Sequence, residues 1–366
     1  MRQLQPQQQA LRACPCSKRV AFRPAAAQPV RAGRRAVHVR SNDDFVDPIT
    51  GEVITRTSVY NAAAGFTVDA GGVTWAYRKS EPAKDKADPA KPQVLLLHGL
   101  GSSSYSYRRT LAMLGDAGYE AYAPDWPGHG GSSKPSSSSF SYSQQAYLDS
   151  LAAFVDTCGI KKPFALVVQG YVLGQYGLLY ALAHEDQISR LFVLNTPLAL
   201  SSKLRPELAA YKSPIPFMRP GNKQFDGTMY NMMGSPYAMM EADAMTFGKP
   251  YRDDPAASAA VSASMEQLDF SALLKQVDDG YRSWRKPSLL LFGANDPFVD
   301  VKNPQAWLDS KRTTMRLVTA TAKLGHMPQE DYPEAIQDAL ESFLTGETDS
   351  WPPGQVVAKM TKKGVV

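Results

Sequence analysis

Uninterrupted apolar runs of four or five residues recur through the chain and constrain its fold more than any other feature. They lie at 94–97, 164–168, 191–194 and 289–292, with helix-length segments between them. A strand that is apolar along its whole length is typical of a parallel sheet with helices on both faces. Alternating strands and helices of this kind predict an α/β fold, and 366 residues suffice for one large core.

Four further segments complete a predicted sheet of eight strands. Residues 66–69 and 73–77 alternate polar and apolar side chains around Gly71 and Gly72, which is typical of a β-hairpin. Strands are also expected at 119–123 and 315–318. The sequence therefore predicts a mostly parallel eight-stranded sheet, with helices at 105–117, 143–158, 172–183 and 333–344.

A long interruption separates the strands at 191–194 and 289–292. Residues 197–283 hold few strand-like runs and eight of the thirteen methionines, which favours an inserted helical cap. Flexible methionines suit the lining of an adaptable apolar cleft, or they fill the core of the cap itself. The core of the fold would then comprise residues 64–196 and 284–346, with a C-terminal tail at 347–366 beyond it.

The basic residues are concentrated at the N-terminus. Residues 1–40 contain nine Arg or Lys and no acid, whereas the remainder has 31 basic and 35 acidic residues. The folded part therefore has no charge excess that favours nucleic acid. An acid-free, Arg-rich leader indicates a transit peptide, for the chloroplast stroma or alternatively the mitochondrion, and a disordered basic tail is the other interpretation. Residues 41–63 are expected to be an extended segment.

Neither a membrane span nor a cysteine cluster is expected. No apolar run approaches the 18–20 residues of a transmembrane helix, so we expect a soluble protein. Removal of the leader takes away Cys14 and Cys16 and leaves Cys158 alone, which excludes an internal disulfide and a cysteine metal cluster. We expect neither a metal nor a cofactor.

Four motifs occur in a characteristic order. They are His98-Gly99-Leu100-Gly101, Asp125-x-Pro127-Gly128-x-Gly130, Gly293-Ala294-Asn295-Asp296-Pro297 and Gly325-His326-Met327-Pro328. In combination, over residues 64–346, the chain resembles the α/β-hydrolase superfamily, in particular its haloalkane-dehalogenase and epoxide-hydrolase-like branch. It is also similar to plastid-targeted plant and algal members with V-V-Q-G-[FY] at the corresponding turn.

The resemblance implies roles for individual residues. Asp296 would be the acid and His326 the base of a catalytic triad, in the order that this fold uses. Backbone N–H groups of Leu100 and Val172 would form the oxyanion hole. Epoxide hydrolases of the family use cap tyrosines to polarise the epoxide oxygen, which makes Tyr230, Tyr237 and Tyr251 candidates for substrate binding; a structural role is the alternative for each.

The nucleophile is where the chain departs from the family. The family turn reads G-x-S-x-G, whereas this chain has Gln169-Gly170-Tyr171-Val172-Leu173. Counting back without a gap from the small residues Gly174, Gly177 and Ala181 places Tyr171 at the nucleophile position. Tyrosine has a pKa of about 10 and is a poor nucleophile unless a base such as His326 lies within hydrogen-bond reach.

Three hypotheses follow. The Asp296–His326 pair acts as a base while Tyr171 orients the substrate or donates a proton, or Tyr171 is itself the nucleophile. In the third, the site is inactive and binds a ligand or protein without turnover. The first two predict a cofactor-independent hydrolase for a small apolar molecule in the cap cleft, such as an ester or an epoxide. The third predicts a non-catalytic binding protein, and protein partners stay open.

Overall fold

A computed structural model describes residues 64–352 apart from 222, 309–311, 313 and 321–323, together with the backbone of five short strands outside that range. These strands are β1 (Asp44–Val46), β2 (Val53–Thr55), β11 (Gly354–Ala358), β12 (Met360–Thr361) and β13 (Gly364–Val365). The chain divides into two units, residues 1–35 and 36–366. The predicted transit peptide at 1–40 lies outside the described residues.

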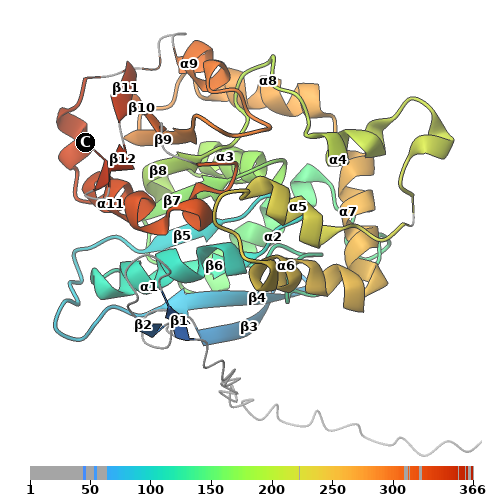
Figure 1. The fold of residues 1–366 in the computed structure, drawn as a ribbon, viewed down its shortest axis with the longest axis horizontal. Coiled ribbons are helices and arrows are strands. Elements are labelled where there is room, and N and C mark those ends of the chain that lie inside the picture. Colours follow the sequence, from blue (N-terminus) through green and yellow to red (C-terminus); the bar gives the residue numbers. More distant parts are fainter. Residues whose placement is uncertain are drawn as a thin grey trace, which may run out of the picture. The chain divides into compact units, whose positions relative to one another are not determined.

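A nine-stranded sheet forms the centre of the second unit (Figure 1). Its order is β11-β10-β9-β8-β7-β5-β6-β4-β3, antiparallel at β3–β4 and β4–β6 and parallel elsewhere. The eight predicted strands are confirmed: β3 (Ala64–Ala70), β4 (Val73–Ser80), β5 (Val94–Leu97), β6 (Ala121–Pro124), β7 (Phe164–Gln169), β8 (Ile188–Leu194), β9 (Ser288–Gly293) and β10 (Met315–Ala320).

The ninth strand comes from the segment expected to lie beyond the fold. After the 3-10 helix η5 (Glu347–Ser350), strand β11 pairs in parallel with β10 and becomes the edge of the sheet. The tail therefore contributes to the sheet, which differs from the expectation. Its prolines and lysines gave no strand signal, because an edge strand needs neither a continuous apolar run nor two buried faces.

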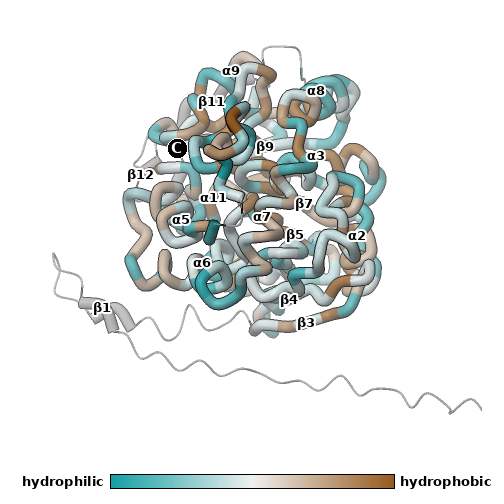
Figure 2. The backbone as a smooth tube through the Cα atoms, turned by 90° about the vertical axis from the view of Figure 1, so that its right-hand side faces the viewer, coloured by the Kyte–Doolittle hydropathy of each residue, from teal (hydrophilic) through white to brown (hydrophobic). Residues whose placement is uncertain are grey.

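Helices cover both faces of the sheet. One hydrophobic cluster joins α2 (Gln144–Thr157), α3 (Leu173–Ala183) and α8 (Phe270–Gly280) to one face; the other joins α1 (Arg108–Asp116) and α11 (Pro333–Leu344) to the opposite face. Strand β5 shows the alternation, since Leu95 and Leu97 belong to the first cluster and Val94 and Leu96 to the second. Figure 2 shows hydrophobic stretches running through the middle of this unit and hydrophilic ones mostly at its periphery.

Local signals explain where the helices begin. The Ser143 side chain caps α2 by accepting a hydrogen bond from the Ala146 N–H, and Pro333 occupies the first turn of α11. Among the described residues between β8 and β9 there are helices and no strand. The five α-helices are α4 (Pro206–Ala209), α5 (Gly227–Gly234), α6 (Glu241–Asp253), α7 (Pro255–Gln267) and α8.

The methionines of this inserted region mostly point outward. Met229, Met233, Met240 and Met245 are 43–49% exposed, as is Tyr237 at 44%. We call these five residues the outer methionine cluster. Because these side chains are exposed, they neither line a closed cleft nor fill the core of the cap. In the part of the chain that the structure describes, no helix is long and apolar enough to cross a membrane.

Candidate active site

Asp296 and His326 meet at the carboxyl edge of the sheet. Asp296 follows β9 and His326 follows β10, and parallel neighbouring strands bring the loops after them to the same edge. The Asp296 Oδ2 lies 2.9 Å from the His326 Nδ1, and the His326 side chain is only 4% exposed. Because a carboxylate only accepts hydrogen bonds, this contact places the proton of a neutral His326 on Nδ1 and leaves Nε2 as an acceptor.

The Asp296 carboxylate has a full set of hydrogen-bond donors. Its Oδ1 accepts from the N–H groups of Phe298 at 2.8 Å and Val299 at 3.1 Å, and its Oδ2 accepts from the Asn195 side chain at 2.7 Å. Burial alone would raise the pKa of Asp296, but His326 and these donors outweigh it and hold the pKa below its usual value of 3.8. The carboxylate therefore stays charged and fixes the imidazole.

Two polar residues that the sequence analysis missed hold the histidine loop. The Asn195 side chain also donates to the Gly325 carbonyl at 3.2 Å, and the Gln169 side chain donates to the His326 carbonyl at 2.8 Å. Asn195 follows β8 and Gln169 ends β7, so both stand at the edge where this fold binds its ligands. Their place at the end of a predicted parallel strand is the sequence signal that could have identified them as candidates.

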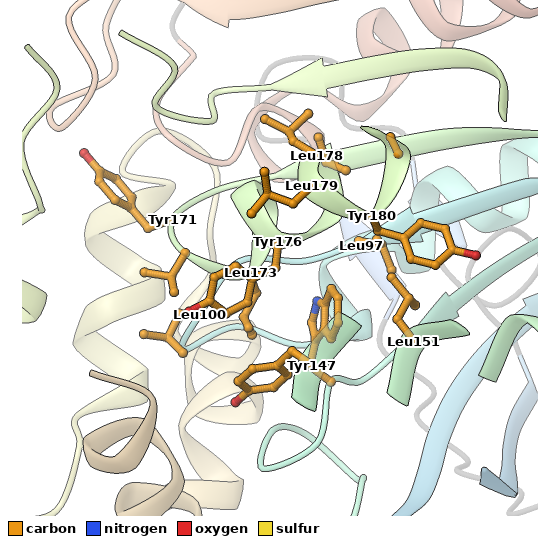
Figure 3. Packing of buried hydrophobic residues seen from close by; sticks show 14 of the residues in the cluster. Leu97, Leu100, Tyr147, Leu151, Tyr171, Leu173, Tyr176, Leu178, Leu179 and Tyr180 are labelled. Atoms are coloured by element: carbon orange, nitrogen blue, oxygen red, sulfur yellow. The ribbon is translucent and has the colours of Figure 1, made fainter. Parts of the chain in front are cut away.

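The Tyr171 side chain lies beside the base without a hydrogen bond to it in the described structure. Its ring centroid is 5.2 Å from that of His326, but its hydroxyl donates to the Phe298 carbonyl at 3.1 Å. In Figure 3 the ring stands apart from Tyr147, Tyr176 and Tyr180. Burial, followed by the charge of Asp296, raises the pKa of Tyr171 well above 10. The nucleophile hypothesis therefore lacks the contact that would activate this phenol.

Gly170 is the residue whose side-chain position faces the base. A β-carbon placed with ideal geometry on Gly170 would lie 3.7 Å from the His326 Nε2 and 3.2 Å from the Gly99 Cα. The φ of Gly170 is +83°, a conformation that glycine adopts at no steric cost. The Gly170 backbone therefore lies beside the ring nitrogen of His326 that does not contact Asp296.

A tight turn follows Tyr171 directly. Val172 has φ 62° and ψ −69°, and the Leu173 N–H bonds to the Tyr171 carbonyl at 2.8 Å. These features define the rare γ-turn with a positive central φ, which is strained for a β-branched residue. The chain thus uses Gly170, Tyr171 and Val172 to pass from β7 to α3.

The Tyr171 carbonyl of this turn accepts a hydrogen bond from one of the two expected oxyanion donors. The Leu100 N–H bonds to the Tyr171 carbonyl at 2.9 Å, so that carbonyl accepts from both Leu100 and Leu173. The expectation that Leu100 offers its N–H to a substrate is not met, because the strained turn points a main-chain oxygen at it. The Val172 N–H has no acceptor among the described residues.

The three candidate cap tyrosines occupy different environments. Tyr230 is 5% exposed, and its ring packs near Gly101 and under the Arg205 guanidinium, which lies 3.5 Å from the ring centroid. Arg205 also stacks on Phe298 at 3.9 Å, and Phe298 meets His326 edge-on. Tyr230 is thereby brought to the site.

The other two tyrosines are placed differently. Tyr251 is buried against Phe225, with ring centroids 4.9 Å apart, and its hydroxyl has no partner within the described structure. Tyr237 belongs to the outer methionine cluster. Its side chain is thus on the surface, whereas its neighbour Pro236 packs near Gly325.

Buried ion pairs tie the histidine loop to the cap. Glu330 lies 2.5 Å from the Arg108 guanidinium, which also reaches Asp243 of α6 at 3.1 Å. Asp331 accepts from the Ser235 hydroxyl at 2.5 Å and from the Gly325 N–H at 2.6 Å. The described residues contain no group of three or more His, Cys, Asp and Glu side chains that could hold a metal ion.

Comparison with known proteins shows the family of this chain. Residues 94–339 match the sequence model of the "Alpha/beta hydrolase family". Epoxide hydrolase A of Mycobacterium tuberculosis is 27% identical over 72% of this chain and 93% of its own length. A haloalkane dehalogenase of Psychrobacter cryohalolentis is 26% identical over 70% of this chain and 84% of its own.

Solved structures agree in fold. The haloalkane dehalogenase DatA of Agrobacterium tumefaciens superposes with a TM-score of 0.61 over 78% of this chain and 97% of its own, at 20% sequence identity. At that identity the likeness concerns the fold alone.

Proposed function

Because the chain belongs to the alpha/beta hydrolase family, we propose that it is a hydrolase in which His326, oriented by Asp296, acts as a general base on water. The observation that carries the proposal is the 2.9 Å hydrogen bond between Asp296 and His326, with the other Asp296 oxygen bonds all satisfied. A base held in one tautomer with a free Nε2 is what proton abstraction requires.

Water takes the place of a side-chain nucleophile in this proposal. The proposal places the attacking water at the His326 Nε2, which Gly170, having no side chain, approaches with its backbone alone. The proposal gives Tyr171 a positioning role, because its hydroxyl holds the Phe298 carbonyl while the Phe298 N–H holds Asp296. A phenol whose pKa burial has raised stays protonated near neutral pH and is a poor nucleophile.

The substrate class we propose is a small apolar epoxide. Acyl transfer needs free N–H donors for an oxyanion, and the Leu100 N–H is engaged by the Tyr171 carbonyl. Epoxide opening can instead take a proton from a phenol, and Tyr230 is the cap tyrosine nearest to the site by its contacts. The relatives named epoxide hydrolase and haloalkane dehalogenase support attack at an alkyl carbon.

The proposed step balances as a simple hydration. His326 Nε2 takes one proton from water, and the water oxygen bonds to an epoxide carbon. The carbon–oxygen bond to the ring oxygen then breaks, and that oxygen takes the Tyr230 proton. Transfer of the proton from His326 back to Tyr230 through solvent regenerates both groups and leaves a diol.

Single-turnover hydrolysis in ¹⁸O-labelled water tests the mechanism. With enzyme in excess over an apolar epoxide, we expect one ¹⁸O in the diol from the first turnover, because the attacking oxygen comes directly from water. A diol that first carries ¹⁶O would show a covalent intermediate with a protein oxygen and overturn the proposal. His326→Ala should slow the reaction by roughly 10²–10⁴-fold, and Tyr237→Phe, on the exposed cap surface, is the matched control.

A second candidate is a non-catalytic binding protein. The engaged Leu100 N–H and the tyrosine at the nucleophile position favour it, since both remove parts that family hydrolysis uses. Under this alternative, His326→Ala binds apolar ligands as the wild type does, and neither protein turns them over.

The transit peptide is a separate proposal. We propose that residues 1–40 direct import into the chloroplast stroma, supported by nine basic and no acidic residues. A fluorescent protein carrying residues 1–40 should accumulate in chloroplasts. Accumulation in mitochondria would favour the alternative, and a cytosolic signal would leave only the basic-tail interpretation.

A further inference from the structure

The segment between α4 and α5 carries the most exposed large apolar side chain among the described residues. Phe217 is 89% exposed, and Met218 and Ile215 beside it are 60% and 41% exposed. We call these three residues the η4 tip, after the 3-10 helix η4 (Pro216–Met218) that holds two of them. In Figure 1 this yellow-green segment projects from the fold at the right of the view. Large apolar side chains exposed together usually mark a binding surface.

Local hydrogen bonds define the conformation of the η4 tip. The Met218 N–H bonds to the Ile215 carbonyl at 3.0 Å, and the Arg219 N–H bonds to the Pro216 carbonyl at 3.1 Å. The Arg219 side chain reaches back to the Ser213 carbonyl at 2.8 Å and closes the loop. Local hydrogen bonds of this kind reduce the chain entropy that binding would cost.

The segment that carries the tip is rich in basic residues. Residues 200–224 contain five Arg or Lys and one acid, while the rest of 41–366 has 26 basic and 34 acidic residues. Lys203, Lys212, Arg219 and Lys223 are exposed. Burial, followed by the charge of Arg219, lowers the pKa of Lys212, while Asp269 and Glu266 act against this shift. An apolar tip next to basic side chains is complementary to a surface with anionic groups outside and an apolar layer beneath them.

The outer methionine cluster provides the contrast. Its five side chains are also exposed, but residues 226–253, from which they come, hold four acids and two bases. Exposed apolar area alone therefore does not distinguish the two surfaces, whereas charge does. An anionic surface would repel the methionine cluster and attract the η4 tip.

We propose that the η4 tip docks the protein on an anionic lipid surface, with Ile215, Phe217 and Met218 inserted below the headgroups. Lys212, Arg219 and Lys223 then lie at headgroup level, where each cation gains from the negative surface potential. The contact is peripheral and does not depend on the proposed hydrolase activity. It would present the protein to apolar molecules dissolved in the lipid.

A local fluorescence probe tests the insertion in the full-length chain. Phe217→Trp is mixed with vesicles of equal parts phosphatidylcholine and phosphatidylglycerol, and Met229→Trp in the methionine cluster is the matched control. We expect a blue shift and quenching by brominated lipid for the tryptophan at 217 and neither for that at 229. Both spectra are taken as differences from the wild type, which carries the five native tryptophans, so binding of vesicles through the basic leader cannot imitate this result.

Cosedimentation with vesicles measures how much the η4 tip contributes to membrane binding. Phe217→Ser with Met218→Ser should lower partitioning into these vesicles about tenfold or more relative to the wild type, which carries the same leader. Added salt should weaken the wild type further. An unchanged emission at 217, or equal partitioning of the double variant, overturns the proposal. So does a change from dimer to monomer in the double variant without vesicle binding, which would make the tip an interface between copies of this chain.

Discussion

The ideal β-carbon position of Gly170 lies 3.7 Å from the His326 Nε2. The Tyr171 hydroxyl, one residue later, is bonded to Phe298 instead. Because the Tyr171 hydroxyl is engaged in this way, our proposal takes the attacking oxygen from water. The predictions below test that arrangement and the framework that holds it.

Gly170→Ala should lower both stability and activity, and Gly72→Ala should lower stability alone. The two glycines have similar φ values of +83° and +77°, which cost an alanine roughly 1–2 kcal/mol. Nothing lies within 4 Å of a methyl group at Gly72, whereas one at Gly170 meets Gly99 at 3.2 Å and stands beside His326. Denaturant unfolding and turnover measure the two effects. A fully active Gly170→Ala would contradict a water site next to the base.

Tyr171→Phe should keep most of the activity. Loss of its hydrogen bond to the Phe298 carbonyl costs about 0.5–1.5 kcal/mol in the free energy of unfolding, and we expect kcat/KM to fall by less than about tenfold. His326→Ala should reduce kcat by roughly 10²–10⁴-fold because it removes the base. If the two variants lose activity equally, Tyr171 belongs to the chemistry, and the nucleophile hypothesis returns.

Asp296 should make the fold less stable in acid. Its folded-state pKa lies below its usual value of 3.8, so its charged form stabilises the folded state above that pH. This contribution is lost as the pH falls below 3.8 through the folded-state pKa, when the carboxylate takes up a proton. Unfolding free energies of the wild type and Asp296→Asn, measured from neutral pH to about pH 2, should converge in acid. Parallel curves would show that the charge of Asp296 contributes no stability.

Glu330→Ala should be strongly destabilising. It leaves the Arg108 guanidinium, 8% exposed, without its closest carboxylate, and breaking such a buried pair costs about 3–5 kcal/mol. The double variant Arg108→Met/Glu330→Leu removes both charges and should recover most of the loss. Thermal unfolding compares the three proteins. A double variant no more stable than Glu330→Ala would assign the loss to packing.

The sequence was sufficient for the elements that have strong local signals. Strand β5 is apolar throughout and α11 begins at Pro333, as predicted. The acid and base motifs likewise led to Asp296 and His326, which the structure brings together. Their positions follow from the strand order, because each lies in the loop after one of two neighbouring parallel strands.

Spacing was insufficient at the turn itself. Counting back from Gly177 without a gap leads to Tyr171, but the sequence reveals neither the γ-turn at Val172 nor the hydrogen bond from the Tyr171 hydroxyl to the Phe298 carbonyl. A strained turn has no sequence signature when a valine occupies it. Tyr230 and Tyr237 could not be separated either, because only tertiary packing decides which of them is buried.

Strand β11 has a consequence for any shortened form of the protein. It supplies the backbone partners of Arg316–Ala320 along one side of β10, whose other side is paired with β9. A chain that stops at residue 346 would leave those amides and carbonyls of β10 unpaired at an open edge. Such edges template pairing between molecules. We therefore expect that removing the last twenty residues (347–366) yields a protein that self-associates into aggregates.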